Sequence, residues 1–137
     1  TAAADLVWSP RENKIMYTAT ASASIPDNLI RELPGSSSQP QERTLKPNSV
    51  YIYDLEEDRN FKVEKGTWFS DSNHLISVKD SKIIITDYDG TNPTLVYSGP
   101  MESVFAGPYP SSKQMLILTN LTGNPATKPN LYAVSLR

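Results

Sequence analysis

Cysteine is absent from this chain of 137 residues, and histidine occurs once, at His74. The sequence therefore excludes disulfides, a thiolate nucleophile and cysteine-ligated zinc, and it leaves little room for a histidine-rich metal site. Basic residues are not in excess: 13 Lys and Arg stand against 15 Asp and Glu, for a net charge of −2. That balance disfavours nucleic acid and anionic membranes as partners. No stretch approaches the ~20 apolar residues of a membrane-spanning helix. We expect no cofactor and no bound metal.

Proline, in contrast, is abundant. The chain has 11 prolines and 6 glycines, and proline lies well above its average share of ~5%, which predicts many turns. Hydrophobic residues make up 38% of the sequence. This content is compatible with a packed core, and the aromatic and β-branched residues distinguish the chain from a disordered one.

Two kinds of segment recur along the sequence. The first combines an aromatic residue or proline at a strand end, a polar turn and an apolar strand; it covers residues 8–17, 68–77 and 108–117. The second is a short run rich in β-branched or aromatic residues that alternates roughly with period two; it covers residues 50–55, 83–88 and 131–136. Turn residues between such runs indicate antiparallel hairpins.

The order of these segments predicts the architecture. Further strands are expected over residues 60–64 and 94–97, the latter after the Asp89-Gly90 turn, whereas the third unit has no equivalent strand. Four strands repeating every ~40–45 residues are typical of a β-propeller. We therefore predict an all-β fold of about three four-stranded antiparallel blades, the last lacking its outer strand, in a partial or oligomer-completed propeller. The predicted blades cover residues 2–65, 66–100 and 101–137 of one propeller segment.

The first unit is longer because of an insertion over residues 18–49, which is rich in proline and serine. We expect a loop with one helical turn from Asp27 to Leu33. Long loops are commonly functional. The candidate partner-binding residues in it are Ile25, Leu29, Ile30, Arg31 and Leu33. The alternative is that the insertion only covers a strand edge of the blade.

The motifs resemble the TolB-type, WD-like propeller repeat, in which a "WSPDGxxIxF" strand pair precedes an "IYxxDxDG" strand. The first unit matches through Trp8-Ser9-Pro10, Lys14-Ile15 and the 50–55 strand. The second matches through Trp68, the polar turn 70–73, the 83–87 strand and Asp89-Gly90. The third departs from the pattern, because Pro108 replaces the tryptophan and Ser135 the aspartate.

The chain is also similar to the carboxy-terminal part of propeller proteins from uncultured small-genome bacteria, which are often joined to a PEGA domain. The stretches that carry this similarity are DYDGTNPTLVYSGP at 87–100 and NLYAVSL at 130–136. The resemblance implies a non-enzymatic protein-interaction or scaffold module of the bacterial cell envelope, on the extracytoplasmic side. Expected partners are other propeller blades, from the same longer chain or a homo-oligomer, and an envelope protein. Alternative roles are an accessory domain that positions substrate for a peptidase or other hydrolase, and a structural spacer.

Catalytic motifs are not recognised. A hydrolytic triad needs a histidine within reach of both partners, but His74 lies in a predicted turn, where we expect it to be exposed, and no G-x-S-x-G motif occurs. The segment starting at Asp87 differs from an EF-hand loop in its glycine position and in having Ser98 at position twelve. We predict that the chain is not an enzyme. The aromatic residues at strand ends are expected to pack in the core between neighbouring blades, and the alternative is that they form a binding surface. They are Trp8, Trp68, Phe69, Phe105 and Tyr109.

Overall fold

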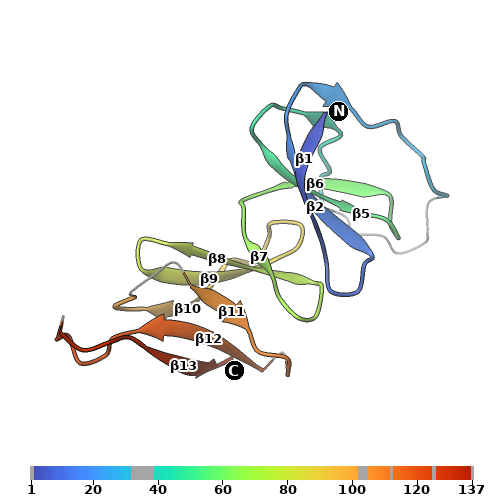
Figure 1. Cartoon of the computed structure of the whole chain (residues 1–137). Helices are drawn as coiled ribbons and strands as arrows, with labels where there is room; N and C mark the ends of the chain where they lie inside the picture. The colour runs from blue at the N-terminus through green and yellow to red at the C-terminus, as the bar shows by residue number, and fades with distance from the viewer. Residues whose placement is uncertain (1, 32–38, 102–104, 112, 125, 137) are drawn as a thin grey trace. The chain divides into compact units, whose positions relative to one another are not determined.

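The computed structural model describes residues 2–31, 39–101, 105–111, 113–124 and 126–136. In this part of the chain every regular element is a β-strand (Figure 1), which confirms the all-β prediction. The chain forms two compact units: an N-terminal unit of residues 1–65 and 88–90, and a C-terminal unit of residues 66–87 and 91–137. The described residues form no closed propeller ring. They also contain no helix long and apolar enough to cross a membrane.

The N-terminal unit is built on a four-stranded antiparallel sheet in the order β1-β2-β5-β6. Its strands are β1 (Ala3–Trp8), β2 (Lys14–Ala19), β5 (Val50–Asp54) and β6 (Arg59–Val63). Tyr17 and Tyr51 are opposite each other on β2 and β5, and their rings stack with centroids 5.8 Å apart. They form a buried cluster with Ala19 and Leu45. The core of this sheet is therefore built around aromatic residues, which favour β-strands and pack well in cross-strand pairs.

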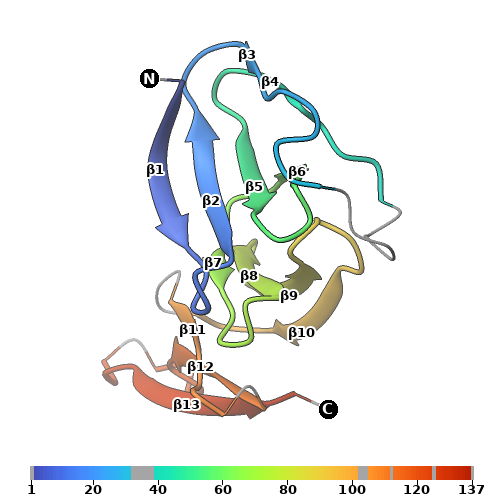
Figure 2. The same ribbon diagram turned by 90° about the vertical axis from the view of Figure 1, so that its right-hand side faces the viewer.

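The insertion of this unit contains a short two-stranded sheet, β3 (Ala23–Ser24) and β4 (Thr44–Leu45), labelled in Figure 2. Leu45 is buried, so the returning half of the insertion is anchored in the core. The expected helical turn is wrong for residues 27–31, which have no helical hydrogen bonding. Asn28 has φ of 58°, which is incompatible with a right-handed turn. The remainder of that expected turn, including Leu33, lies outside the described residues.

A second four-stranded sheet belongs to the C-terminal unit, in the order β10-β9-β8-β7. Its strands are β7 (Thr67–Trp68), β8 (His74–Lys79), β9 (Lys82–Asp87) and β10 (Thr94–Ser98). Asp80 and Ser81 form the two-residue turn between β8 and β9, and both have positive φ, as type I′ hairpins require. Gly66 precedes β7 where an added Cβ would lie 2.8 Å from the carbonyl oxygen of Ile76, so a side chain at this position would clash with the backbone of β8.

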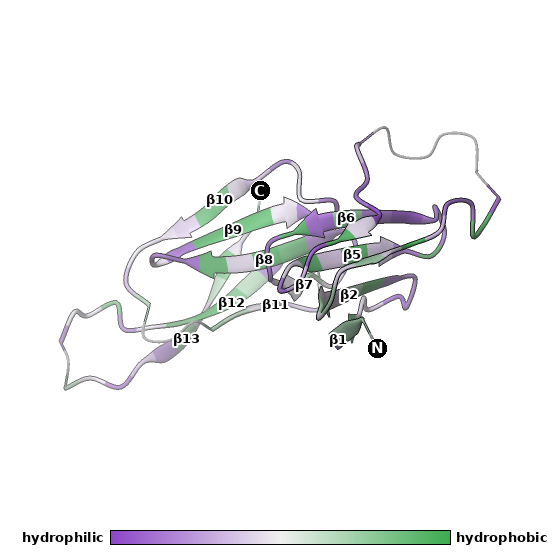
Figure 3. Cartoon of the chain, turned by 90° about the horizontal axis from the view of Figure 1, so that it is seen from above, coloured by the Kyte–Doolittle hydropathy of each residue, from purple (hydrophilic) through white to green (hydrophobic). Residues whose placement is uncertain are grey.

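The third sheet has three strands in the order β11-β12-β13, namely β11 (Ala106–Pro108), β12 (Gln114–Thr119) and β13 (Asn130–Ser135). It shares one core with the second sheet, and Figure 3 shows apolar residues along β8, β9 and β12. The buried members of this core are Phe69, Ile76, Ile83, Met115 and Ile117.

The aromatic series at strand ends is divided between core and surface. Trp68 and Phe69 are buried as expected. The expectation is wrong for Trp8, Phe105 and Tyr109, whose exposed fractions are 50%, 46% and 41%. Trp8 ends an edge strand, Phe105 precedes a three-residue edge strand and Tyr109 follows it, so each lies where only one side of the backbone has a neighbouring strand.

Candidate functional site

The outer strand of the third sheet, β13, offers a long and regular edge. It pairs with β12 over six residues without a register shift, and no other described strand pairs with it. The N–H of Leu136 donates to the carbonyl of Lys113 on the β12 side. Because backbone groups alternate along a strand, Leu131, Ala133 and Ser135 direct their N–H and C=O groups away from β12. The strand carries no charge and no proline, so it lacks the residues that usually protect an edge.

The other sheet edges of the two units are less suited to strand pairing. The pairing of β1 is interrupted by a bulge between Ala4 and Val7, and that of β10 by a bulge between Leu95 and Tyr97. At the remaining edges of the C-terminal unit, β7 has two residues and β11 three, and β11 ends at Pro108, which has no N–H to donate. Bulges, short strands and proline all oppose edge-to-edge pairing.

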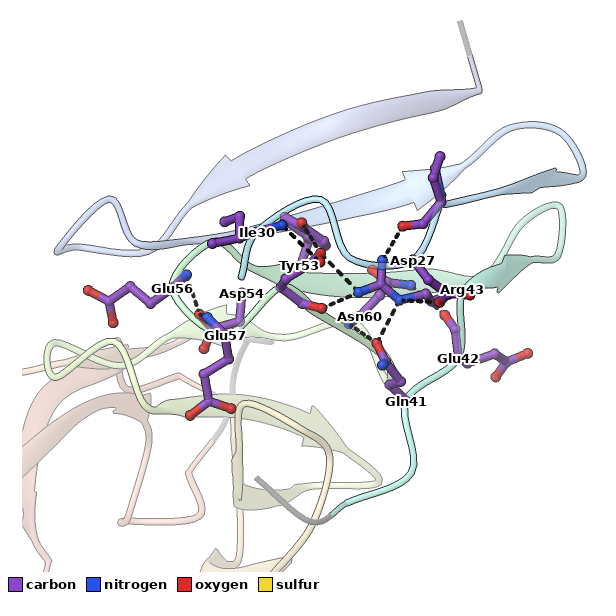
Figure 4. A network of polar contacts seen from close by, with 12 residues as sticks. Asp27, Ile30, Gln41, Glu42, Arg43, Tyr53, Asp54, Glu56, Glu57 and Asn60 are labelled. Carbon is purple, nitrogen blue, oxygen red and sulfur yellow. Dashed lines mark hydrogen bonds and ion pairs between the residues drawn. The ribbon is translucent and has the colours of Figure 1, made fainter. Parts of the chain in front are cut away.

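The edge at β6 is covered by the returning half of the insertion, which Figure 4 shows beside it. The N–H of Glu42 donates to the carbonyl of Asn60 over 2.8 Å. The side-chain amide of Asn60, which is fully buried, donates to the carbonyl of Glu42 over 2.6 Å and accepts from the Tyr17 hydroxyl at 2.8 Å. Arg59 reaches the carbonyl of Gln39 at 2.9 Å. The insertion therefore satisfies backbone groups that an open edge would expose.

Arg43 fixes the insertion to the β5–β6 turn (Figure 4). One guanidinium nitrogen lies 2.9 Å from a carboxylate oxygen of Asp58, and another lies 3.2 Å from Asp27. The side chains of Arg43 and Asp58 are only 11% and 6% exposed. Asp58 also accepts hydrogen bonds from the Tyr53 hydroxyl at 2.5 Å and from the N–H of Ile30 at 3.2 Å.

These contacts affect how the buried groups titrate. Burial alone would raise the pKa of Asp58, but the hydrogen bonds from Tyr53 and Arg43 outweigh it, so the pKa is lowered. Burial, together with the neighbouring Asp58 carboxylate, raises the pKa of Tyr53 to about 12. The network therefore holds Asp58 as a carboxylate and Tyr53 as a neutral donor, which is the pairing that their hydrogen bond requires.

The candidate partner-binding residues of the insertion do not form one surface. Ile25 packs partly buried against the Tyr17 cluster, whereas Leu29, Ile30 and Arg31 are exposed. The backbone of Ile30 is held by Asp58. Leu33 lies outside the described residues. The side chains of Leu29 and Ile30 are thus exposed, whereas the segment from Gln39 to Leu45 covers the edge of β6 and packs into the core.

In the C-terminal unit, the single histidine is clamped between two aspartates at the start of β8. The Nδ1 of His74 lies 2.6 Å from Asp71, and its Nε2 lies 3.3 Å from Asp87. Asp71 belongs to the preceding turn and also accepts the backbone N–H groups of Asn73 and His74. Burial would raise the pKa of Asp71, but these hydrogen bonds and the contact with His74 lower it. The expected turn position is wrong, because His74 is the first residue of β8. Its side chain is 40% exposed.

Asp87 stands opposite His74 in the β8–β9 ladder. Its second carboxylate oxygen accepts a hydrogen bond from the Asn92 amide at 2.6 Å. These groups lie on the wall of a cavity of about 500 Å³. The polar side chains along the cavity are Asp71, His74, Asp87, Asn92, Thr94 and Ser135, and the apolar ones are Phe69, Ile85, Leu95, Val96 and Leu136.

The geometry of His74 differs from that of a hydrolytic triad. Both ring nitrogens face carboxylates, so neither is left to accept a proton from Ser135 or Thr94, the hydroxyl residues of the cavity. Asp71 and Asp87 lie on opposite sides of the imidazole ring instead of converging with it on one point. In the described part of the chain no group of three or more His, Asp or Glu side chains is placed to hold a metal ion.

Sequence reasoning missed both the His74 clamp and the Arg43 anchor. The clamp has a usable signal: a two-residue turn at Asp80 and Ser81 places residue 74 directly opposite residue 87. Recognising that turn would have paired His74 with Asp87. Arg43 has no such signal, because its partners lie 15 or 16 residues away in sequence on either side.

Comparison with known proteins gives no relative from which a role could be transferred: no protein-family model matches the chain, and no curated protein matches it either.

Proposed function

We propose that this chain is a non-catalytic protein-interaction module made of TolB-type propeller blades, and that it associates with a second copy of itself through β13. The observation that carries the proposal is the long, regular and uncharged edge of β13, set against the bulged, short or covered edges of the other strands. Two sheets have four strands and the third has three among the described residues. Pairing with the β13 of a second copy would join two of these three-stranded sheets edge to edge into one continuous six-stranded sheet.

A second copy fits this edge because β13 is complementary to itself. In an antiparallel arrangement centred on Ala133, Ala133 faces its own copy and Leu131 faces Ser135 of the second copy. All three residues direct their backbone groups outward, so each pair exchanges two hydrogen bonds. Leu131, which is 55% exposed, then packs across the junction. The symmetric contact closes as a dimer, as two-fold interfaces do.

The cell-envelope location and the scaffold role rest on the resemblance to TolB-type propellers. A scaffold needs surfaces that hold neighbouring copies or blades together, and a strand edge provides such a surface without catalytic groups. The carboxylate-bound His74 supports a non-catalytic role, because neither of its ring nitrogens is placed to activate a nucleophile.

The test is sedimentation velocity of the whole chain from about 10 µM to about 1 mM. A single strand pair is small compared with a standard interface of ~1,600 Å², so we expect weak dimerisation, with a dissociation constant on the order of 100 µM. Leu131→Lys places a charge at the edge and is expected to weaken the dimer by at least about tenfold.

The matched control is Leu6→Lys. Leu6 is likewise an exposed leucine on an edge strand, at 59% exposure, but it lies within the bulge of β1, so this charge is expected to leave the dimer unchanged. A chain that sediments as a monomer at every concentration contradicts the proposal. Equal weakening by the two substitutions also contradicts it, because the contact would then not be specific to β13.

A further inference from the structure

The cavity beside His74 is lined by apolar side chains on one side and by polar, acidic side chains on the other. We propose that it is a binding site for an aliphatic cation, meaning an ammonium or guanidinium group on a hydrocarbon stem, of the kind carried by an alkylamine or by a lysine or arginine side chain. The cavity, of about 500 Å³, is within the range of small-molecule sites. The groups that would hold the cation are Asp71, in the turn before β8, and Asp87, on β9, whereas the proposed strand pairing uses backbone groups of β13. The two sites adjoin at Ser135, which also lines the cavity.

The apolar side of the cavity would contact the hydrocarbon stem of the ligand. Phe69 follows β7, Ile85 belongs to β9, Leu95 and Val96 belong to β10, and Leu136 follows β13. Leu95 is 56% exposed, so it presents apolar surface that a hydrocarbon stem would cover. A hydrocarbon stem against these side chains would remove apolar surface from water on both sides of the contact.

The polar side of the cavity would bind the cationic group of the ligand. Asp71 and Asp87 carry two negative charges, and among the described residues that line the cavity the only basic side chain is His74, which lies between them. A carboxylate accepts about four hydrogen bonds, so Asp87, which the structure joins to His74, Asn92 and Thr91, retains acceptor capacity. Its side chain is 33% exposed. An ammonium or guanidinium group can donate to it, whereas an anion would be repelled by both aspartates.

The test uses the single histidine as a reporter, because its ring proton signals in an NMR spectrum belong to one residue. Three probes of equal chain length are added to the whole chain at fixed pH: pentylamine, pentanoate and 1-pentanol. Pentylamine is expected to shift the His74 ring signals in a saturable way, and pentanoate is expected not to. If 1-pentanol binds as tightly as pentylamine, or if pentylamine leaves His74 unchanged, the proposal is overturned.

Two variants localise the charge that binds the probe. Asp87→Asn keeps the shape of the side chain and is expected to weaken pentylamine at least about tenfold. Asp80→Asn makes the same chemical change in the β8–β9 turn, at a position with positive φ that asparagine tolerates, and is expected to leave binding unchanged. Equal weakening by both variants contradicts the site. The peptide acetyl-Gly-Lys-Gly-amide serves as a fourth probe: tighter binding than pentylamine assigns the site to a peptide side chain, and weaker binding assigns it to a free amine.

Discussion

Arg43→Ala is expected to lower the free energy of unfolding of the N-terminal unit by about 3–5 kcal/mol. The substitution removes the guanidinium from Asp58, whose side chain is only 6% exposed, and so leaves a buried carboxylate without its cation. It also removes hydrogen bonds to the carbonyls of Pro26 and Asp58. The measurement is urea unfolding followed by the amide NMR signals of β2 and β5.

Arg31→Ala is the control, because Arg31 belongs to the same insertion but is exposed; its expected effect is within about 0.5 kcal/mol. The lowered pKa of Asp58 adds a pH dependence. A carboxyl group with a depressed pKa contributes stability that is present above its ordinary value of 3.8 and is lost as the pH falls through the folded-state value. This acid-induced loss should be smaller in Arg43→Ala. If Arg43→Ala and Arg31→Ala unfold at the same urea concentration, Arg43 is not an anchor.

Replacing residues 22–46 with a short Gly-Ser turn is expected to prevent stable folding of the N-terminal unit. The replacement removes the Arg43 anchor and the buried Leu45, and it uncovers the backbone of Asn60 on β6. Their combined loss, at least about 5 kcal/mol, is comparable to the whole stability of a small domain. The expected result is loss of the β2 and β5 amide signals, together with lower solubility, because the edge of β6 becomes open to pairing.

The double substitution Leu29→Ser and Ile30→Ser separates this structural role from partner recognition. It removes exposed apolar side chains but leaves Arg43, Leu45 and the cover of β6 in place, so the unit should keep its stability. A stable, soluble protein after replacement of residues 22–46 would contradict edge protection. Loss of partner capture from envelope extract by the double substitution alone would assign recognition to Leu29 and Ile30.

Strand positions could be predicted from the sequence because they depend on local patterns. Alternation in 50–55 and the turn at Asp89-Gly90, whose glycine has φ of 84°, are properties of a few neighbouring residues. The β3–β4 pair and the absence of helix over residues 27–31 cannot be predicted from such local patterns, because they depend on contacts with residues distant in sequence. Leu29 and Ile30 have helical spacing, but Asn28 in the left-handed region and the hydrogen bond from Ile30 to Asp58 determine the backbone there.

The candidate sites were harder to predict because they depend on contacts distant in sequence. Which edge is open follows from bulges at β1 and β10 and from the insertion over β6, and none of these has a clear signature in composition. Exposure of aromatic residues was misjudged similarly: Trp68 and Trp8 occupy corresponding positions in the repeats, yet one is 5% exposed and the other 50%. The repeat predicts that both tryptophans lie at strand ends, but only the tertiary structure determines which of the two side chains is buried by neighbouring residues.

The most direct test of the β13 interface is backbone amide hydrogen exchange at low and high protein concentration. We expect that Leu131, Ala133 and Ser135, whose N–H groups point away from β12, exchange about fourfold more slowly at about 1 mM than at about 10 µM, because a dissociation constant on the order of 100 µM leaves about a fifth of the chains monomeric at the higher concentration. Tyr132 and Val134, which face β12, should already be protected at low concentration. Exchange at Leu131, Ala133 and Ser135 that stays equally fast at both concentrations would contradict pairing at this edge.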